Sequence, residues 1–418
     1  MSRIDRLIAE LCPDGIEFMA LGDIAELVRG NGMPKSDFTE SGVGCIHYGQ
    51  IYTHYGVWAT ETISFVAPDT AAPLAKVDAG DLIITNTSEN VEDVCKAVAW
   101  LGESQIVTGG HATVIKHGQD PKYLSYYFRT PDFLAQKKKQ ATGTKVIDVS
   151  AKSLAKIRVP VPPLEIQREI VKVLDGFTQL EAELEAELEA RRRQYKYYRD
   201  ALLTFGERTD SASKQASKQA SIRWTTLSDI CLSVSSGGTP LSRRADFYGG
   251  DIPWLRTQEV DYSDIHSTSV TITEAGLKNS AAKWVPANSV IVAISGAGVT
   301  RGRVAVNKIP LTTNQHCCNM EIDPAQAHYR FVYHWLVNQY DDLRSRGHGN
   351  RSDLNIGIIK AYPIPVPSLD DQERIAAILD KFDALVNDLS SGLPAEIKAR
   401  RQQYEHYRDR LLTFREAA

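Results

Sequence analysis

A basic stretch between residues 129 and 158 is the first candidate for chemistry in this sequence. It holds eight Lys or Arg against two acids, and Arg344, Arg346, His348 and Arg351 form a second basic group later in the chain. Basic side chains near turns can reach phosphates, and neutralising phosphates supplies much of the affinity of proteins for DNA. A solvated surface charge run is the alternative. Because both halves of the chain carry such a group, we favour phosphate binding.

Side chains that could read bases stand near predicted turns in both halves. Arg can pair with guanine through two hydrogen bonds, and Asn or Gln can do the same with adenine. Any one of these residues alone is better explained as an ordinary surface residue, but the set favours contact with DNA. The residues that we expect to contact DNA are Lys35, Ser36, Tyr48, Gln50, Asn86, Lys145, Arg243, Arg244, Gln258, Arg301, Arg303 and Arg351.

Residues that could bind a metal or catalyse a reaction lack the partners that such sites need. His316 precedes Cys317 and Cys318, but no second ligand pair has suitable spacing, so buried thiols are favoured. His111 occupies the matching place in the first half. No nucleophile accompanies either histidine, so both are interpreted as core or hydrogen-bonding residues. We expect no metal ligand and no catalytic residue in this chain.

Other sequence motifs of catalytic or nucleotide-binding sites are either absent or matched only in part. Residues 289–302 read as a strand followed by Gly-x-Gly, but the strand-like RVAVN comes next, which favours a turn that projects Arg301 over a dinucleotide site. A GxxxxGK(S/T) phosphate loop and the Asn/Asp-Pro-Pro-aromatic signature of amino-methyltransferases are absent. Glu396 and Lys398 have nuclease-like spacing, but they lie in a predicted packing helix.

The elements that must position these residues occur twice. Residues 190–205 read ARRRQYKYYRDALLTF and residues 399–414 read ARRQQYEHYRDRLLTF, identical at twelve of sixteen positions. Arg, Tyr, Leu and Phe recur there every three or four residues, which predicts a helix face that packs on another helix. Residues 21–38 also match residues 227–244 at a constant offset of 206. The chain is therefore a duplication that covers a domain and a helix.

The two copies keep the same order of elements between their matching ends. Strand-like runs, aromatic helical segments and proline-rich exits follow one another in each, and the exits predict helix starts. The first helix should run from about residue 164 to 205, with Leu180, Leu184 and Leu188 in a tetrapeptide repeat. The second copy should break near residues 390–394. The polar, low-complexity run at 212–221 predicts a flexible linker.

This arrangement closely resembles the specificity subunit of type I restriction–modification enzymes. The resemblance rests on the two repeated helices, on the entries PVPPLEIQREIV and PVPSLDDQERIA, and on GGTPLSRRADFYGGDIPWL in the second half. The tetrapeptide repeat resembles the spacer of one branch of that family. The resemblance implies two target-recognition domains that each read half of a split sequence in double-stranded DNA.

The same resemblance implies partners and cofactors. Two methyltransferase subunits would dock on the repeated helices, and restriction and motor subunits would join them. No cofactor is expected in this chain, since S-adenosylmethionine, ATP and Mg would belong to the partner subunits. The helix residues that we expect at the partner interface are Tyr195, Tyr198, Arg199, Tyr404, Tyr407 and Arg408.

The predicted fold class is α+β. Two tandem α/β target-recognition domains would each be followed by a long helix, and the helices would pair as an antiparallel coiled coil with pseudo-twofold symmetry. The predicted parts are an N-terminal helical segment (1–17), the first domain (18–160), the central spacer helix (161–208), the linker (209–221), the second domain (222–365) and the C-terminal helices (366–418).

Composition adds little to this interpretation. The net charge of −4 does not by itself indicate a nucleic-acid partner. Without an 18-residue apolar run or a signal peptide, we expect a cytoplasmic protein that has no membrane partner. The alternative function is a coiled-coil adaptor that joins proteins without reading DNA.

Overall fold

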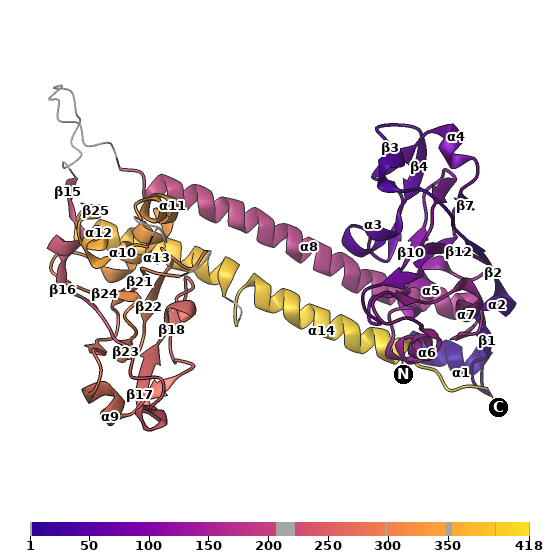
Figure 1. The fold of residues 1–418 in the computed structure, drawn as a ribbon. Helices are drawn as coiled ribbons and strands as arrows, with labels where there is room; N and C mark the ends of the chain where they lie inside the picture. The colour runs from indigo at the N-terminus through magenta and orange to yellow at the C-terminus, as the bar shows by residue number, and fades with distance from the viewer. Residues whose placement is uncertain (1, 206–221, 297–298, 348–352, 389, 418) are drawn as a thin grey trace. The chain divides into compact units, whose positions relative to one another are not determined.

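The computed structural model describes residues 2–205, 222–296, 299–347, 353–388 and 390–417. The chain divides into two compact units (Figure 1). The first unit comprises residues 1–185 and 396–418, and the second comprises residues 186–395. Each unit contains β-sheets of its own together with segments of the long helices. The domain limits predicted from the sequence stay predictions, because these units divide the chain inside two helices.

Two five-stranded sheets form the body of the first unit. Their central strands are continuous apolar runs, as strands buried on both faces require, and β8 and β10 are buried at every residue. Neighbouring strands pair antiparallel except β5 with β10 and β4 with β11, which are parallel. The first sheet has the order β2 (Ala25–Arg29), β12 (Ala112–His117), β8 (Leu82–Thr85), β10 (Ala97–Trp100) and β5 (Trp58–Ala59), and the second has β3 (Phe38–Thr39), β6 (Ser64–Val66), β4 (Val43–Ile46), β11 (Ile106–Thr108) and β7 (Ala75–Val77).

The second unit repeats this topology with a different sequence, except that its second-named sheet has four strands instead of five. Its parallel pairs, β18 with β22 and β17 with β23, stand at the corresponding places in the sheets. The prediction that the duplication covers a domain agrees with this repeated strand order. The first sheet of this unit has the order β16 (Cys231–Ser236), β24 (Cys317–Ile322), β21 (Val290–Ala293), β22 (Val304–Asn307) and β18 (Asp264–Ile265). The second has the order β19 (Thr271–Ile272), β17 (Tyr248–Leu255), β23 (Leu311–Thr313) and β20 (Trp284–Val285).

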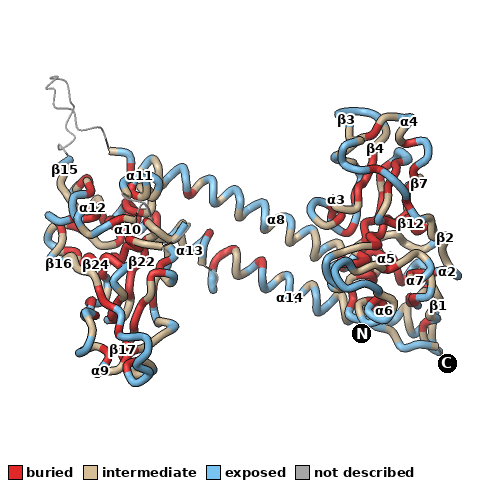
Figure 2. Tube along the Cα trace, in the orientation of Figure 1, coloured by how far each residue is buried: buried red, intermediate tan, exposed pale blue. Residues whose placement is uncertain are grey.

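One aromatic helix lies against the first-named sheet of each unit. In the first unit it is α5 (Pro121–Tyr127), which starts at the N-cap Asp120 with proline as its first residue. In the second unit it is α10 (Tyr329–Asn338), where Phe331, Val332 and Leu336 are buried in the core. Figure 2 shows buried residues concentrated along the strands and these helices.

The long helices carry mostly half-buried and exposed residues (Figure 2). Helix α8 (Leu164–Leu202) is continuous over 39 residues rich in Leu, Glu, Ala and Arg, which are strong helix formers. The second copy is split into α13 (Leu369–Asn387) and α14 (Leu393–Leu411), so the predicted break near residues 390–394 is confirmed. Gly392 allows the close backbone approach at the break, because an added Cβ would lie 2.4 Å from the Ala384 carbonyl oxygen.

Helix pairs form within each unit. In the first unit Arg401 of α14 contacts Glu181 and Glu185, and Tyr407 stacks on Phe177 at 5.3 Å. The α14 numbers rise as the α8 numbers fall, so this pair is antiparallel, as predicted. In the second unit Tyr198 of α8 stacks on Phe382 of α13, also at 5.3 Å. The pseudo-twofold relation between the halves stays a prediction.

The remaining elements connect these parts. The Ile16 amide donates to the Arg415 carbonyl oxygen at 2.8 Å, so the C-terminal segment completes the first unit. None of the helices in the described ranges has both the length and the apolar character of a membrane span. The other elements are α1 (Arg3–Leu11), β1 (Phe18–Ala20), α2 (Leu21–Ile24), η1 (Lys35–Asp37), α3 (Tyr48–Thr53), α4 (Pro68–Ala71), β9 (Thr87–Ser88), α6 (Pro131–Gln140), β13 (Ile147–Asp148), α7 (Ala151–Leu154), β14 (Arg158–Pro160), β15 (Arg223–Thr226), η2 (Leu227–Ile230), η3 (Ala245–Phe247), η4 (Thr257–Glu259), α9 (Glu274–Lys278), α11 (Tyr340–Ser345), α12 (Ile356–Lys360) and β25 (Pro363–Val366).

Candidate nucleic-acid interface

Two loops that are distant in sequence meet in each unit. In the first unit the loop after β2 reaches the loop before β12, and the Gly110 amide donates to the Gly32 carbonyl oxygen at 2.8 Å. In the second unit the Gly238 amide donates to the Thr313 carbonyl oxygen at 2.9 Å. A Cβ on Gly237 would lie 1.8 Å from that same oxygen. Glycine is therefore required where the paired loops meet.

A third segment, which follows the first parallel strand of the second-named sheet, completes each cluster. In the first unit this is the start of α3, where the Tyr48 ring lies 4.5 Å from His47 and 5.0 Å from His111. His111 is exposed, and its Nδ1 lies 3.1 Å from the Thr87 hydroxyl. Burial and the nearby charge of Lys35 lower the pKa of His47. We call residues 30–37, 47–48, 87 and 109–111 the first loop surface.

The second unit builds its cluster from different side chains. Here η4 takes the place of α3, and the Thr257 hydroxyl donates to Asn314 Oδ1 at 3.0 Å. Gln315 contacts the Thr239 hydroxyl, and its amide lies 3.3 Å from the His316 ring. Gln258 and Arg243 are exposed beside them. We call residues 237–244, 257–258 and 314–316 the second loop surface.

Two amide residues predicted to contact DNA are structural instead. Gln50 is buried. Its side-chain carbonyl oxygen accepts from the His47 amide at 2.9 Å, and its side-chain nitrogen donates to the Ser64 hydroxyl at 2.6 Å. Asn86 is fully buried, donates to the Val149 carbonyl oxygen at 2.8 Å and accepts from Thr113 at 2.9 Å. The prediction for both residues is corrected, since neither amide is available to a base.

Two of the predicted arginines are held by neighbouring acids. The Arg244 guanidinium binds both oxygens of Asp246 at 2.7 and 2.6 Å. Arg303 pairs with Asp261 at 2.5 Å. A DNA phosphate or base would have to displace these acids, so the two residues become weaker candidates. Arg301 is half-buried between β21 and β22, and Arg351 lies outside the described residues.

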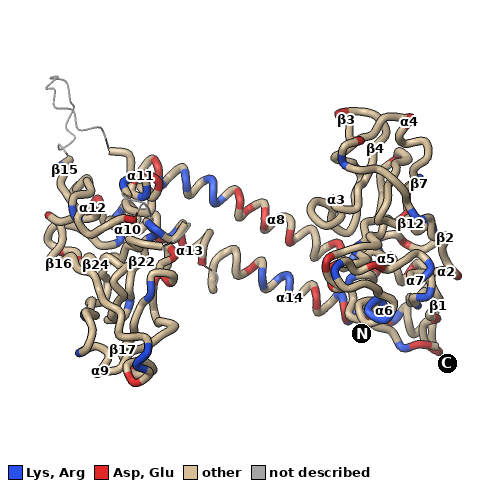
Figure 3. The backbone as a smooth tube through the Cα atoms, in the orientation of Figure 1, with Lys and Arg blue, Asp and Glu red and all other residues tan. Residues whose placement is uncertain are grey.

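The basic stretch of the first unit is only partly exposed. Lys137 is buried and donates to the Val94 carbonyl oxygen at 2.6 Å, and burial lowers the pKa of Arg129. Arg158 pairs with Glu416 at 2.7 Å. Figure 3 shows the remaining Lys and Arg near α6 and α7. Lys139, Lys145, Lys152 and Lys156 are exposed, and their charge fits a phosphate backbone, whereas the exposed Lys138 pairs with Glu92 at 3.5 Å.

The histidines before β12 and β24 were undervalued by sequence reasoning. Both His111 and His316 are exposed within the loop surfaces, and the ring of each has a hydrogen-bond partner, so of the two predicted roles, core or hydrogen-bonding, the structure shows the second. The matching positions of the two histidines in the two copies were the sequence signal that could have marked them as surface residues.

Cys317 and Cys318 are buried thiols, as predicted, and burial raises the pKa of each to about 12. Across the described residues no cluster of His, Cys, Asp or Glu could hold a metal ion.

The predicted partner residues divide into packed and exposed ones. Tyr195 is buried, and Arg199 stacks on its ring at 5.6 Å. Arg408 stacks on Tyr404 at 5.7 Å in the same manner. The Arg199 and Arg408 side chains are only 23% and 14% exposed, so little of either is open to a partner.

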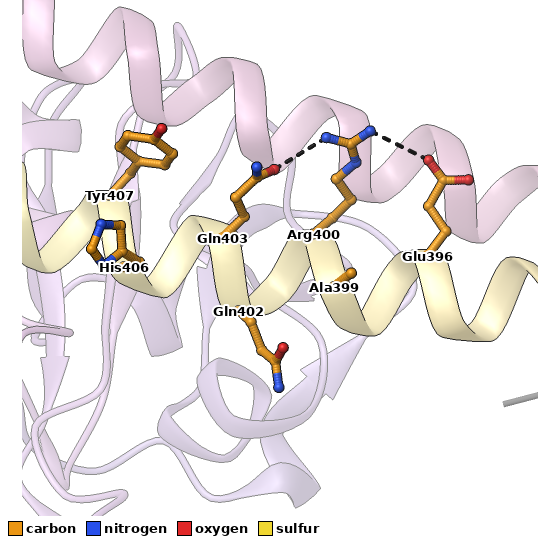
Figure 4. A pocket seen from close by; sticks show the side chains of 7 residues that line it. All are labelled: Glu396, Ala399, Arg400, Gln402, Gln403, His406 and Tyr407. Carbon is orange, nitrogen blue, oxygen red and sulfur yellow. Dashed lines mark hydrogen bonds and ion pairs between the residues drawn. The ribbon is translucent and has the colours of Figure 1, made fainter. Parts of the chain in front are cut away.

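The side chains of Tyr198 and Tyr407 are partly exposed at the edges of their helix pairs. They are 39% and 36% exposed and stack on Phe382 and Phe177 in closely similar geometry. Beside Tyr407 a pocket follows α14 (Figure 4), in which Arg400 binds Gln403 at 3.1 Å and Glu396 at 3.4 Å. The pocket is open and lined by residues of α14, which suits a protein surface better than an enclosed small-molecule site.

Comparisons with known proteins place these features among restriction–modification proteins. A family model described as the type I restriction modification DNA specificity domain matches residues 13–190 and 223–399. The specificity subunit of the Escherichia coli type I restriction enzyme EcoR124I/EcoR124II is 35% identical over 276 residues, which span 64% of this chain and 65% of that subunit.

Solved structures share the fold. The S subunit of a type I restriction-modification system from M. genitalium gives a TM-score of 0.57 at 14% identity, with 95% of this chain and 96% of that chain covered. A chain from work on complex assembly and conformational transition of the type I R-M system gives 0.58 at 14% identity, with 95% and 97% covered.

Proposed function

The chain belongs to the type I restriction modification DNA specificity domain family, and on this premise we propose that it reads a split, asymmetric DNA sequence for a methylation and restriction complex. Each unit would contact one half of the sequence with its loop surface. The chain itself would be non-catalytic. Methyl transfer with S-adenosylmethionine and cleavage with ATP and Mg would take place in partner subunits in the cytoplasm.

The observation that carries this proposal is the repetition of one loop arrangement with different side chains. The first loop surface offers Lys35, Tyr48 and His111, and the second offers Arg243, Gln258 and His316. Base edges are distinguished by the donors and acceptors that face them, so unlike side chains on like loops should read unlike half-sites. Ser36 and Lys145 are exposed and stay candidates for phosphate contact.

Partner docking is proposed at the repeated helices. Two methyltransferase subunits would each contact one helix pair at Tyr198 or Tyr407, since half-open aromatic side chains are typical anchors of protein interfaces. Restriction and motor subunits would join through the methyltransferases. A coiled-coil adaptor without DNA recognition is disfavoured by the family to which the chain belongs.

Genome-wide methylation mapping tests the function directly. Cells that express this chain with its methyltransferase should carry methylated adenines or cytosines within one motif made of two unlike half-sites and a fixed gap. Cells that express the methyltransferase alone are the control. The same methylated sites in both strains would contradict the proposal, because the motif would then not depend on this chain.

A further inference from the structure

An aspartate of a long helix binds two side chains of the aromatic helix in the second unit. Asp380 of α13 accepts from Arg330 Nε at 2.8 Å and contacts His334 Nε2 at 2.6 Å. Arg330 also binds Asp264 of β18 at 2.8 Å. His334 is fully buried and the Arg330 side chain is 10% exposed. This contact therefore joins the sheet, the aromatic helix and the long helix through two buried side chains and two partly exposed carboxylates, since the Asp380 and Asp264 side chains are 37% and 32% exposed.

The first unit holds the same arrangement with different residues. Asp175 of α8 binds Lys122 Nζ at 2.7 Å and accepts from the Tyr126 hydroxyl at 2.8 Å. Lys122 stands two residues after the N-cap of α5, and Tyr126 stands four residues further on. Arg330 and His334 have the same spacing on α10. We call Asp175 with Lys122 and Tyr126, and Asp380 with Arg330 and His334, the aspartate clamps.

A buried glutamine supports each clamp from the same long helix. Gln167 stands eight residues before Asp175 and accepts from the Asp120 amide at 2.9 Å. Gln372 stands eight residues before Asp380 and accepts from the His328 amide at 2.8 Å. Both glutamines are fully buried. Each aromatic helix is thus bound to its long helix at its N-cap residue and again along its length.

We propose that the aspartate clamps are positioning elements that fix the angle of each target-recognition domain on its own helix segment and thereby set the gap length that the DNA motif tolerates. This inference rests on the proposed function. Apolar packing alone permits sliding and rotation, because dispersion contacts are not directional. Charge-assisted hydrogen bonds from two directions to one carboxylate are directional and strong. A domain held in this way presents its loop surface at one angle only.

The test uses the full chain in complex with its methyltransferase subunits. Three duplexes carry both mapped half-sites, with the natural gap or with one base pair more or fewer, and dissociation constants are measured for each. We expect the wild-type complex to prefer the natural gap. Asp380→Asn should reduce this preference about tenfold, since it weakens charged hydrogen bonds. The penalty for a mismatch within either half-site should not change.

Matched variants separate positioning from stability. His334→Tyr copies the first clamp and should keep the gap preference, and Glu373→Gln removes an exposed charge from the same helix and should do likewise. A variant that is merely destabilised would lose affinity for all three duplexes by one factor, and such a result for Asp380→Asn would overturn the proposal.

If Asp380→Asn does not fold, a milder variant tests whether the clamps set the gap preference. Tyr126→Phe removes one hydroxyl group and leaves Lys122 on Asp175, so the preference should fall about threefold. An unchanged preference in this variant would overturn the proposal. A wild-type complex that bound every duplex alike, unrelated sequences included, would instead overturn the proposed function, and the clamp proposal with it.

Discussion

At the scale of single residues, hydrogen-bond partners decide which polar side chains are available to DNA. Asn86 and Gln258 have similar base-pairing potential, yet Asn86 is fully buried with both ends of its amide bonded, whereas Gln258 is exposed on η4. A base contact needs a side chain whose donors and acceptors are not already used.

This difference predicts that alanine substitution lowers stability at Asn86 but alters base preference at Gln258. Asn86→Ala should reduce the free energy of unfolding by about 2 to 4 kcal/mol, because it leaves the Val149 carbonyl and the Thr113 hydroxyl without their partner. Gln258→Ala should change stability by less than about 0.5 kcal/mol and alter base preference in the second half-site. Urea unfolding and methylation mapping measure the two effects. An Asn86→Ala protein of normal stability would contradict this account.

His334 gives the aspartate clamp of the second unit a pH dependence near neutral pH, whereas Tyr126 stands at the matching position of the first clamp. Burial lowers the pKa of His334 below 6.5, and the hydrogen bond and charge of Asp380 only partly oppose that effect. Arg330 and Asp383 are the other charges near the ring. Protonation would also place a buried N–H at Nδ1, which has no partner in the structure. The folded state therefore binds this proton less readily than the unfolded state.

It follows that stability from His334 is complete above about pH 6.5 and is lost as the pH falls toward the lower pKa of the folded state. The wild-type free energy of unfolding should decrease more between pH 7.5 and pH 5.5 than that of His334→Tyr. Urea unfolding of both full-length chains at the two pH values checks this. Parallel pH profiles would show that His334 does not contribute.

At the scale of secondary structure elements, the tetrapeptide repeat contributes little to the core of either unit, and only its Leu188 packs against the core of the second unit as a partly buried residue. No residue from 180 to 190 is fully buried, and the boundary between the compact units falls inside the repeat at Glu185. Ion pairs between residues four apart, such as Glu187 with Arg191 at 3.2 Å, support the helix there. An insertion in this segment therefore displaces no fully buried residue of the repeat itself.

Insertion of LEAE after Ala190 should lengthen the gap of the DNA motif by about one base pair. Four residues extend a helix by about 6 Å and rotate it by a net 40° or so. One base pair rotates DNA by roughly 34–36°. Both half-sites should stay the same in methylation maps. An unaltered gap would show that the repeat is not the spacer.

Sequence reasoning succeeded where periodicity determines structure and failed where contacts do. The spacing of Tyr195, Tyr198 and Leu202 predicted a packing helix, and the break before α14 was predicted at residues 390–394. The burial of Gln50 and the pairing of Arg303 with Asp261 depend on partners 14 and 42 residues away. Neither partner is marked by any local pattern, so these residues could not be sorted without the fold.

At the scale of the whole molecule, docking and recognition should be separable. Tyr198→Ala with Tyr407→Ala removes the two half-open aromatic side chains at the helix edges. We expect this double variant to lose most of the methyltransferase in co-purification while keeping its fold by circular dichroism. Tyr197→Ala, which removes a tyrosine that is 69% exposed, is the control. Full co-purification of the double variant would place the partner interface elsewhere.

Exchange of one domain tests the central claim most directly. Residues 22–157 carry the whole first loop surface, while the second loop surface lies outside them. Replacing this segment with that of another family member, followed by methylation mapping, should change one half of the motif and leave the other half intact. A motif that changed in both halves, or in neither, would contradict the account that each unit reads one half-site.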